Sequence, residues 1–278
     1  ESYLKSISLN PDDQRLLYEI DLIYADGRED PEIRLQLLQK HHDAIAHNNV
    51  SDALAREIMI LVQLGRYDEA LEIVADNYFR QWEGVSKAYN SYVDAHIFQG
   101  LNHYSSKDYK KAIEDFMAAG EFPANMMVAK PYRGGRSCQV YYLLGLVYEA
   151  MGKTEKAKEQ FQLCVNERQN PELSENHFYV ASALKKLGRN KEALEIFDGL
   201  IVLGKKRISS SEVDFFAKFG ERQTRDDMLS DAYYLAGLGY RGKGMKKEAE
   251  TMFSESVRLN INNAWAAKYL TQNTKNEQ

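Results

Sequence analysis

The sequence predicts an all-α fold, a right-handed α-solenoid of stacked helical hairpins with loop inserts. Three observations support this. Apolar residues recur at helical rather than strand spacing along nearly the whole chain. The 278 residues include 5 Pro and 17 Gly, which is few for a β-rich or loop-rich protein. One short pattern of small and bulky residues also repeats several times, as expected when similar hairpins pack side by side.

Residues 139–164 contain the clearest hairpin. In its first half, small or apolar residues lie at i, i+3, i+4 and i+7: Tyr141, Leu144, Gly145 and Tyr148. In its second half they lie at i, i+4 and i+7: Ala157, Phe161 and Cys164. Each predicted helix has one apolar stripe and about a dozen residues, which is marginal for an isolated helix. The hairpin therefore needs similar neighbours to bury its apolar faces.

Copies of this pattern occur along the chain. A turn glycine precedes an alanine by five residues at Gly65, Gly152, Gly188 and Gly244, and Lys107 takes the glycine's place in a fifth copy. The alanines are Ala70, Ala112, Ala157, Ala193 and Ala249, and the apolar residues one turn later are Val74, Phe116, Phe161, Phe197 and Phe253. Glycine permits the turn, alanine permits close helix approach, and the bulky residue fills the space beside it.

A second small residue precedes the turn by seven positions at Gly100, Gly145, Ala181 and Gly237. With these positions, the pattern resembles the tetratricopeptide repeat, which has a period of about 34 residues. The resemblance covers nearly the whole chain. It implies hairpins stacked into a superhelix, with the first helix of each hairpin lining the concave face.

The pattern divides the chain into segments of one solenoid domain, 1–278. Asp30 followed by Pro31 predicts a helix start, for a helix that runs to about His47. We expect the tail of a preceding repeat, a degenerate repeat, five further repeats and a capping helix with a polar tail: 1–12, 13–50, 51–92, 93–137, 138–173, 174–229, 230–263 and 264–278.

Inserts lengthen the spacing between some repeats. They fall near residues 78–84, 122–135 and 204–228. Trp82 lies in the first insert, where it either anchors the loop on the helices or takes part in binding. Tyr132, Arg133 and Arg136 lie in a glycine-rich stretch, either as an ordinary connector or as a contact loop, because loops held by a rigid scaffold often carry recognition.

Composition narrows the function classes. The net charge of −5 argues against a nucleic-acid-binding footprint. No apolar run approaches the ~20 residues that span a bilayer. The motifs of phosphate loops, nucleophile elbows and metal-ligand clusters are missing from the sequence. We therefore expect no catalytic residues, no cofactor and no metal, and a non-catalytic protein.

The concave face is the candidate binding site. Applying the repeat pattern to the first helices places eight residues on that face: Tyr104, Tyr142, Leu146, Glu149, Phe178, Lys185, Tyr234 and Arg241. Tyr142, Phe178 and Tyr234 occupy equivalent positions in three repeats, and such rings offer broad, rigid contact area. Two interpretations remain open: the rings pack between neighbouring hairpins, or they line a groove for a peptide or a glycan.

Three further elements resemble the C-terminal repeat region of certain large bacterial proteins, which carry an N-terminal domain of unknown function. They are the Asn10–Glu19 run, Phe79-x-x-Trp82-Glu83-Gly84 and Leu238–Gly244. The resemblance implies a scaffold that binds a protein or peptide, or its own missing N-terminal domain. The alternative is an accessory module of a carbohydrate-active or glycan-binding protein. The resemblance to these bacterial proteins favours the periplasm or cell envelope over the cytoplasm. The residues alone do not decide the location.

Two cysteines, Cys138 and Cys164, stand at opposite ends of the central hairpin. Antiparallel helices bring such ends together. The thiols are either small buried side chains or a disulfide, and the second requires Cα atoms within about 7 Å.

Overall fold

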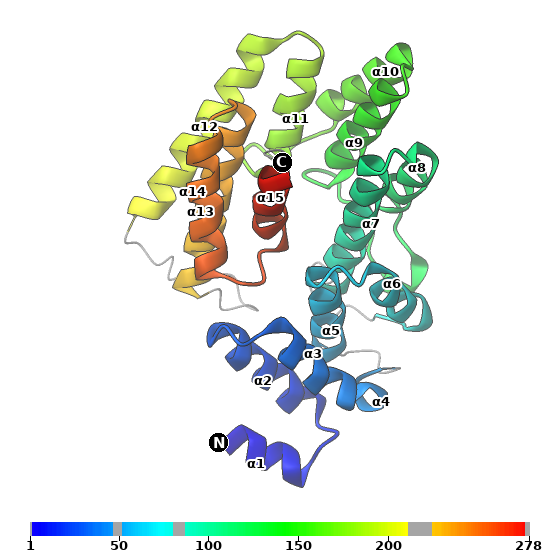
Figure 1. Cartoon of the computed structure of the whole chain (residues 1–278), viewed down its shortest axis with the longest axis vertical. Coiled ribbons are helices and arrows are strands. Elements are labelled where there is room, and N and C mark those ends of the chain that lie inside the picture. The colour runs from blue at the N-terminus through cyan, green and yellow to red at the C-terminus, as the bar shows by residue number, and fades with distance from the viewer. Residues whose placement is uncertain (1, 47–51, 80–86, 211–223, 276–278) are drawn as a thin grey trace. The chain divides into compact units, whose positions relative to one another are not determined.

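The computed structural model describes residues 2–46, 52–79, 87–210 and 224–275. The fold class is the predicted one. In these residues the chain is all-α, and its helices form hairpins like those of the tetratricopeptide repeat (TPR) (Figure 1). Two compact units can be distinguished, Glu1–Lys130 and Pro131–Gln278. Each unit has its own buried apolar residues, and each is described by itself below.

The first unit begins with α1 to α4, which are Ser2–Leu9, Gln14–Asp26, Pro31–Lys40 and His42–Ile45. The predicted start at Asp30 is confirmed, because its carboxylate accepts a hydrogen bond from the Glu32 amide at 2.8 Å. The predicted extension to about His47 is wrong. His41 leaves the helical backbone region with φ −116°, so α3 ends at Lys40 and the separate turn α4 follows.

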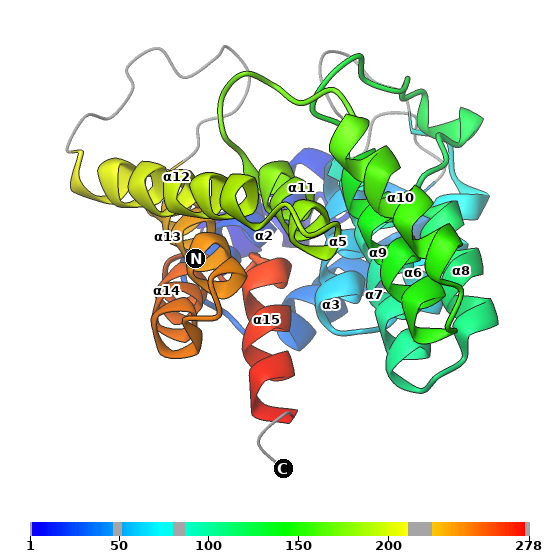
Figure 2. The ribbon, with the colours of Figure 1, turned by 90° about the horizontal axis from the view of Figure 1, so that it is seen from above.

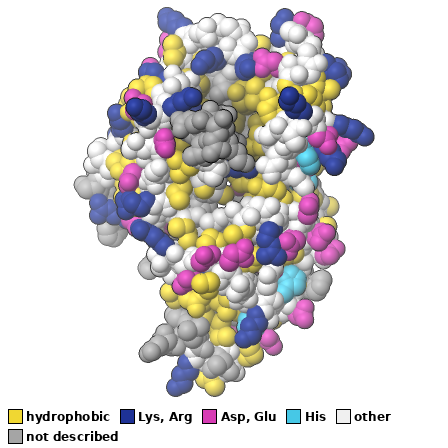
Figure 3. Space-filling model, viewed as in Figure 1, with side chains coloured by type: hydrophobic (Ala, Val, Ile, Leu, Met, Phe, Trp, Pro, Cys, Tyr) yellow, Lys and Arg dark blue, Asp and Glu magenta, His cyan; other side chains and the backbone are white. Residues whose placement is uncertain are grey.

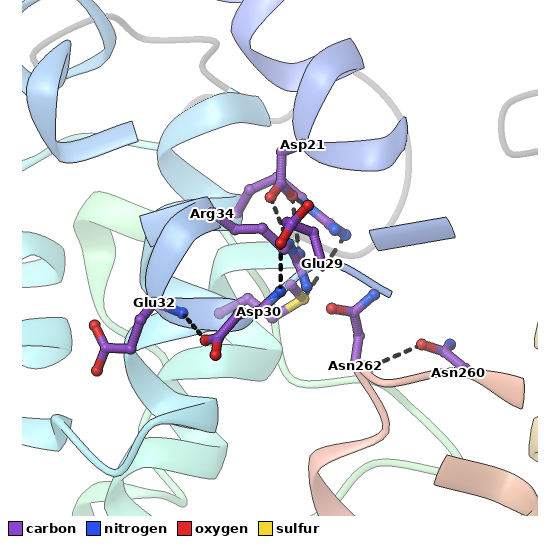
Figure 4. A network of polar contacts seen from close by, with 9 residues as sticks. Asp21, Glu29, Asp30, Glu32, Arg34, Asn260 and Asn262 are labelled. Atoms are coloured by element: carbon purple, nitrogen blue, oxygen red, sulfur yellow. Dashed lines mark hydrogen bonds and ion pairs between the residues drawn. The ribbon is translucent and has the colours of Figure 1, made fainter. Parts of the chain in front are cut away.

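A buried ion-pair network joins the helices of this unit. Arg34 on α3 and Asp21 on α2 are both fully buried, and two guanidinium nitrogens of Arg34 donate to the two carboxylate oxygens at 2.8 and 3.1 Å (Figure 4). Arg56, on the next helix α5 (Asp52–Gln63), donates to the same carboxylate. Asp21 therefore connects three helices through charged hydrogen bonds.

The remaining helices of the first unit form hairpins. They are α6, α7 and α8, followed by the 3-10 turn η1: Tyr67–Asp76, Lys87–Ser105, Tyr109–Ala118 and Ala124–Met126. The segment after α8 folds back on the end of α6. There Asn125 donates to the carbonyls of Val74 and Asn77, and its own carbonyl accepts from the Phe79 amide at 2.7 Å. Part of the predicted insert is thus an ordered packing element.

The second unit holds seven helices among its described residues. They are α9 to α15: Ser137–Ala150, Thr154–Asn166, Glu175–Lys186, Asn190–Ser209, Arg225–Gly242, Lys246–Leu259 and Ala264–Lys275. The predicted insert at 204–228 is too long. Helix α12 continues to Ser209 and α13 begins at Arg225, so both helices take up part of it. Figure 2 shows α15 next to α13 and α14.

The predicted turns are confirmed at all five positions. Gly65, Gly152, Gly188 and Gly244 have φ between 71° and 80°, and Lys107 has φ 64°. This left-handed conformation suits glycine and strains a residue with a Cβ atom. The structure therefore explains four of the five residues, and it leaves Lys107 as a strained exception.

The small-residue positions are confirmed as well. A Cβ atom added to Gly100, Gly145 or Gly237 would lie 2.4–2.6 Å from a ring carbon of Phe116, Phe161 or Phe253, respectively. Each phenylalanine is the bulky residue of the second helix in the same hairpin. The two helices of these hairpins therefore approach so closely that only glycine fits.

Candidate functional site

Helices α9, α11 and α13 supply the aromatic residues predicted for the concave face. Phe178 on α11 is buried, while Tyr142 on α9 and Tyr234 on α13 are partly buried against the core of the second unit. Packing therefore accounts for Phe178. Whether this face also binds a ligand stays a prediction.

Tyr269 of α15 joins these aromatic residues. Its ring centroid lies 6.4 Å from those of Phe178 and Tyr234, and 5.1 Å from that of Phe253 on α14. We call Phe178, Tyr179, Tyr234, Phe253 and Tyr269 the aromatic cluster. Tyr269 therefore packs against α11, α13 and α14. That α15 also caps the exposed end of the array stays a prediction.

A chain of hydroxyl and amide groups runs through the aromatic cluster. The Gln139 side-chain amide donates to the Tyr179 hydroxyl at 2.7 Å, and the Tyr179 and Tyr269 hydroxyls lie 3.2 Å apart. Burial raises the pKa of Tyr179 well above its usual value and also raises the pKa of Tyr269. Both phenols therefore stay protonated and neutral, so each remains a hydrogen-bond donor in an apolar site.

Tyr142 extends the cluster toward α10. Its ring lies 6.0 Å from that of Tyr179 and 5.9 Å from that of Phe161. Burial raises the pKa of Tyr142 to about 12. Its phenol is therefore also neutral, and it joins the hairpin of α9 and α10 to the uncharged aromatic cluster.

Two arginines contact the rings of α15. The guanidinium carbon of Arg241 lies 4.4 Å from the ring centroid of Tyr269, and that of Arg136 lies 5.7 Å from the ring of Trp265. Both distances are within the range of cation–π attraction. Arg241 was predicted for the concave face and Arg136 for an insert loop, so the structure brings a predicted loop residue to the start of α15.

The other predicted residues of the second unit lie around these rings. Leu146 is partly buried against the same core. Glu149 is exposed and forms an ion pair with Lys186 of α11. Lys185 is exposed and donates to the carbonyl of Gly242 at 3.3 Å. Glu149 and Lys185 therefore remain accessible beside the cluster.

The predicted residue Tyr104 belongs to a different unit from the aromatic cluster. It lies on α7 of the first unit, with its ring 6.1 Å from that of Tyr109. Trp82 lies outside the described residues.

The predicted contact loop has an exposed aromatic ring. The Tyr132 side chain is 72% exposed, and the guanidinium carbons of Arg168 and Arg133 lie 4.8 and 5.6 Å from its ring centroid. The Gly134 amide donates to the Arg168 carbonyl at 3.0 Å, which fixes the loop against the end of α10. The loop and the segment after α10 thus present one ring and two cations to solvent.

The first unit has a separate acidic cavity of about 400 Å³. It is lined by Gln39, His42, Glu57, Glu69, Glu72, Ile73, Asp76 and Asn77. Glu57 is buried and lies 2.9 Å from the His42 ring nitrogen. Burial raises the pKa of Glu57, and the hydrogen bond from His42 partly offsets this. Sequence spacing gave no signal for this cavity, because its side chains come from separate helices.

On the face drawn in Figure 3, basic and acidic side chains are interspersed rather than segregated.

Cys138 and Cys164 are free buried thiols, and the Cys138 sulfur donates to the Asn176 carbonyl at 3.6 Å. In the described residues, no group of three His, Cys, Asp or Glu side chains is placed to hold a metal ion.

Comparison with known families identifies the central hairpin. The family model described as tetratricopeptide repeat matches residues 139–171. The chain contains a tetratricopeptide repeat. This repeat comprises most of α9 and all of α10, so the aromatic position at Tyr142 lies on the first helix of a recognised repeat.

Several solved structures match the chain at low sequence identity. A chain of the APC/C hetero-tetramer Cut9–Hcn1 is 15% identical with a TM-score of 0.41, and the match covers 97% of this chain and 44% of that one. The Pseudomonas aeruginosa protein pilF is 17% identical with a TM-score of 0.37, and the match covers 95% and 97%. YrrB, described as a TPR protein with an unusual peptide-binding site, is 18% identical with a TM-score of 0.25, and the match covers 96% of this chain and 97% of that one. All three TM-scores are below 0.5, so these matches do not bear on the function of this chain.

None of the helices that the structure describes is both long and apolar enough to cross a membrane.

Proposed function

We propose that this chain is a non-catalytic scaffold that binds a protein partner through α9, α11 and α13 of the second unit. The observation that carries the proposal is that Tyr142, Phe178 and Tyr234 are linked through Tyr179 and Tyr269 into one largely buried aromatic surface, with Arg241 beside it. Aromatic residues and arginine are enriched where proteins bind each other. Exposed Glu149 and Lys185 next to this surface supply a charged rim.

We also propose that the chain belongs to a larger protein of the kind that its sequence resembles. In this form the chain is the C-terminal part of a bacterial protein, and the partner is its N-terminal domain or another protein. Repeat scaffolds bind through extended concave surfaces, and their partners are held by many contacts rather than by a deep pocket. The tetratricopeptide match at residues 139–171 supports a role in protein binding.

Site-specific photo-crosslinking tests the proposed surface. A photoreactive residue replaces Glu149 on α9, and a matched control replaces Lys110 on α8, whose side chain is 88% exposed. Captured proteins are identified by mass spectrometry, purified and titrated against the chain. We expect a partner that is captured at position 149 and not at 110.

Charge reversal then checks that the captured partner uses this rim. Lys185→Glu should weaken its binding about tenfold, and Lys110→Glu should leave it unchanged, because a rim charge acts only where the partner approaches. Equal effects of the two substitutions would contradict the proposed surface.

The glycan-binding alternative has one observation in its favour. Tyr132 presents an exposed ring between two arginines, and such a ring can stack on a sugar. Titration calorimetry with bacterial cell-wall oligosaccharides tests this alternative. Binding that Tyr132→Ala abolishes and Lys185→Glu leaves intact would favour the accessory module over the scaffold.

A further inference from the structure

Helix α15 lies on the surface proposed above for a partner. Tyr269 is 6% exposed and contacts rings from α11, α13 and α14, and Ala266 one turn earlier is fully buried. The Trp265 ring lies near that of Tyr269, with ring centroids 5.8 Å apart and the ring planes tilted by 47°. One short helix thus covers aromatic positions of two hairpins with two rings placed four residues apart.

The residues around α15 make contacts that depend on its aromatic side chains. Arg241 and Arg136 lie over the rings of Tyr269 and Trp265, and the Tyr179 hydroxyl lies within hydrogen-bond distance of the Tyr269 hydroxyl. Cation–π contacts select aromatic groups, while a buried hydroxyl selects a tyrosine over a phenylalanine. The buried Ala266 permits close approach of the helix backbone. These features suit an amphipathic helix with aromatic residues at i and i+4 and a small residue between them.

The connection between α14 and α15 is held separately from the aromatic cluster. The Asn263 amide donates to the Ser256 hydroxyl at 3.0 Å, and the Asn260 amide donates to the Asp227 carboxylate at 2.8 Å. The Asn263 side-chain oxygen accepts from the Ala266 amide at 3.0 Å. These contacts stabilise the turn at residues 260–263. None of them involves the Tyr269 side chain.

The length of α15 makes its own stability dependent on this packing. It has 12 residues, which is marginal for an isolated helix in water. The short connection keeps it at a high effective concentration near the cluster. A competing helix must therefore overcome a tethered occupant, and its apparent affinity is reduced by the fraction of time that α15 is bound.

We propose that α15 is an internal occupant of the partner site, and that the partner inserts an amphipathic helix of the same chemistry in its place. This inference rests on the proposed scaffold function. It adds the class of ligand, which is a helical protein segment with aromatic residues at i and i+4. It also adds a means of regulation, because α15 must be released before the partner binds.

The first test uses the full chain and a labelled synthetic peptide of residues 261–275, INNAWAAKYLTQNTK, as the probe. Tyr269→Ala removes the anchor of the internal occupant and leaves α9, α11 and α13 intact. Fluorescence anisotropy should show at least about tenfold tighter binding to Tyr269→Ala than to the wild type. The double variant Tyr269→Ala/Arg241→Ala should lose this gain. A peptide with alanine in place of its tyrosine is the matched control and should not bind.

A second measurement avoids variants that fail to fold. Hydrogen exchange of the wild-type chain should show that α15 amides exchange faster than those of α11, and that excess peptide accelerates α15 further without changing α11. Exchange in α15 that is as slow as in α11 and indifferent to the peptide would overturn the inference. So would a folded Tyr269→Ala variant that binds no peptide.

These outcomes separate the inference from the scaffold function. A partner captured at position 149 that binds the wild type and Tyr269→Ala equally well would leave the scaffold intact and end the role of α15. Peptide binding without any captured partner would retain the helix site and end the scaffold proposal.

Discussion

The hydroxyl groups of Tyr179 and Tyr269 lie 3.2 Å apart, although 90 residues separate them in the chain. Tyr179 also accepts a hydrogen bond from the buried Gln139 amide at 2.7 Å. A single phenol therefore connects α9, α11 and α15. Because both tyrosines are buried, loss of this hydroxyl leaves polar groups without water to replace it.

Tyr179→Phe tests this connection. We expect it to lower the free energy of unfolding of the second unit by about 1–3 kcal/mol, since it leaves the Gln139 amide without its partner. Tyr132→Phe is the control, because Tyr132 is exposed and water replaces its contacts. Urea unfolding followed by circular dichroism measures both. An equal effect of the two substitutions would show that the buried hydroxyl is not a special contact.

Gly145 and Phe161 illustrate the close approach of helices within a hairpin. A Cβ atom at Gly145 would lie 2.4 Å from a ring carbon of Phe161. Gly145→Ala should therefore destabilise the second unit by about 1–3 kcal/mol through overpacking. In a double-mutant cycle, Phe161→Leu should cost less in the Gly145→Ala background than in the wild type, because the smaller side chain relieves the clash. Simple additivity would contradict a direct contact.

Substitutions at Lys107 and Gly152 should change stability in opposite directions, because both residues adopt the left-handed turn conformation. Lys107 adopts φ 64° with a Cβ atom present, whereas Gly152 adopts φ 71° and an added Cβ would meet nothing within 4 Å. Lys107→Gly should raise the free energy of unfolding of the first unit by about 0.5–1 kcal/mol, since the strain of the left-handed backbone is removed. Gly152→Ala should lower that of the second unit by about 1 kcal/mol, through backbone strain alone. Thermal melts of both variants check the signs, and matching signs would refute the argument.

Local patterns made the hairpins predictable from the sequence. The turn positions, the buried alanines and the phenylalanines beside Gly100, Gly145 and Gly237 all depend on spacings of a few residues. Those spacings reflect the geometry of one helix or one turn. For the same reason the equivalence of Tyr142, Phe178 and Tyr234 was visible as soon as the repeats were aligned.

Long-range contacts were not predictable in this way. Tyr269 reaches Phe178 and Tyr179 from a distant helix, and no spacing in the sequence encodes that meeting. The extra length of α12 and α13 was read as an insert because the small-residue pattern is interrupted there. The Asp21–Arg34–Arg56 network and the acidic cavity likewise bring together charged side chains that a sequence pattern assigns to a solvated surface.

Asp21 is the centre of a buried charge network. Asp21→Asn removes the charge of the carboxylate that pairs with the fully buried Arg34. Removal of one member of a buried pair costs about 3–5 kcal/mol, so the first unit should lose a large part of its stability. Arg15→Ala breaks the exposed pair with Glu19, in which the Arg15 side chain is 85% exposed, and should cost less than about 1 kcal/mol. Urea unfolding compares the two variants, and similar losses would mean that Asp21 is more hydrated than the structure indicates.

The buried Glu57 carboxyl should make the stability of the first unit fall as pH rises. Burial raises its pKa above the ordinary value of 4.5, and the nearby His42 offsets only part of that rise. The folded state therefore binds this proton more tightly than the unfolded state. The resulting stabilisation is present below about pH 4.5 and is lost as pH rises through the folded pKa. Glu57→Gln cannot titrate, so its stability relative to the wild type should increase between pH 4 and pH 7.

Glu69 lines the same cavity and serves as a control, because its effect on the pH dependence of stability should have the opposite sign. Its hydrogen bond with Arg66 lowers the pKa of Glu69, so its stabilisation is lost as pH falls through the folded pKa. Glu69 is exposed and screened by solvent, so Glu69→Gln should show only a small trend, in the direction opposite to Glu57→Gln. Thermal melts from pH 4 to pH 7 measure both differences. A flat or falling difference for Glu57→Gln would mean that His42 compensates fully for the buried carboxylate, and that the cavity carries its charge without cost to the fold.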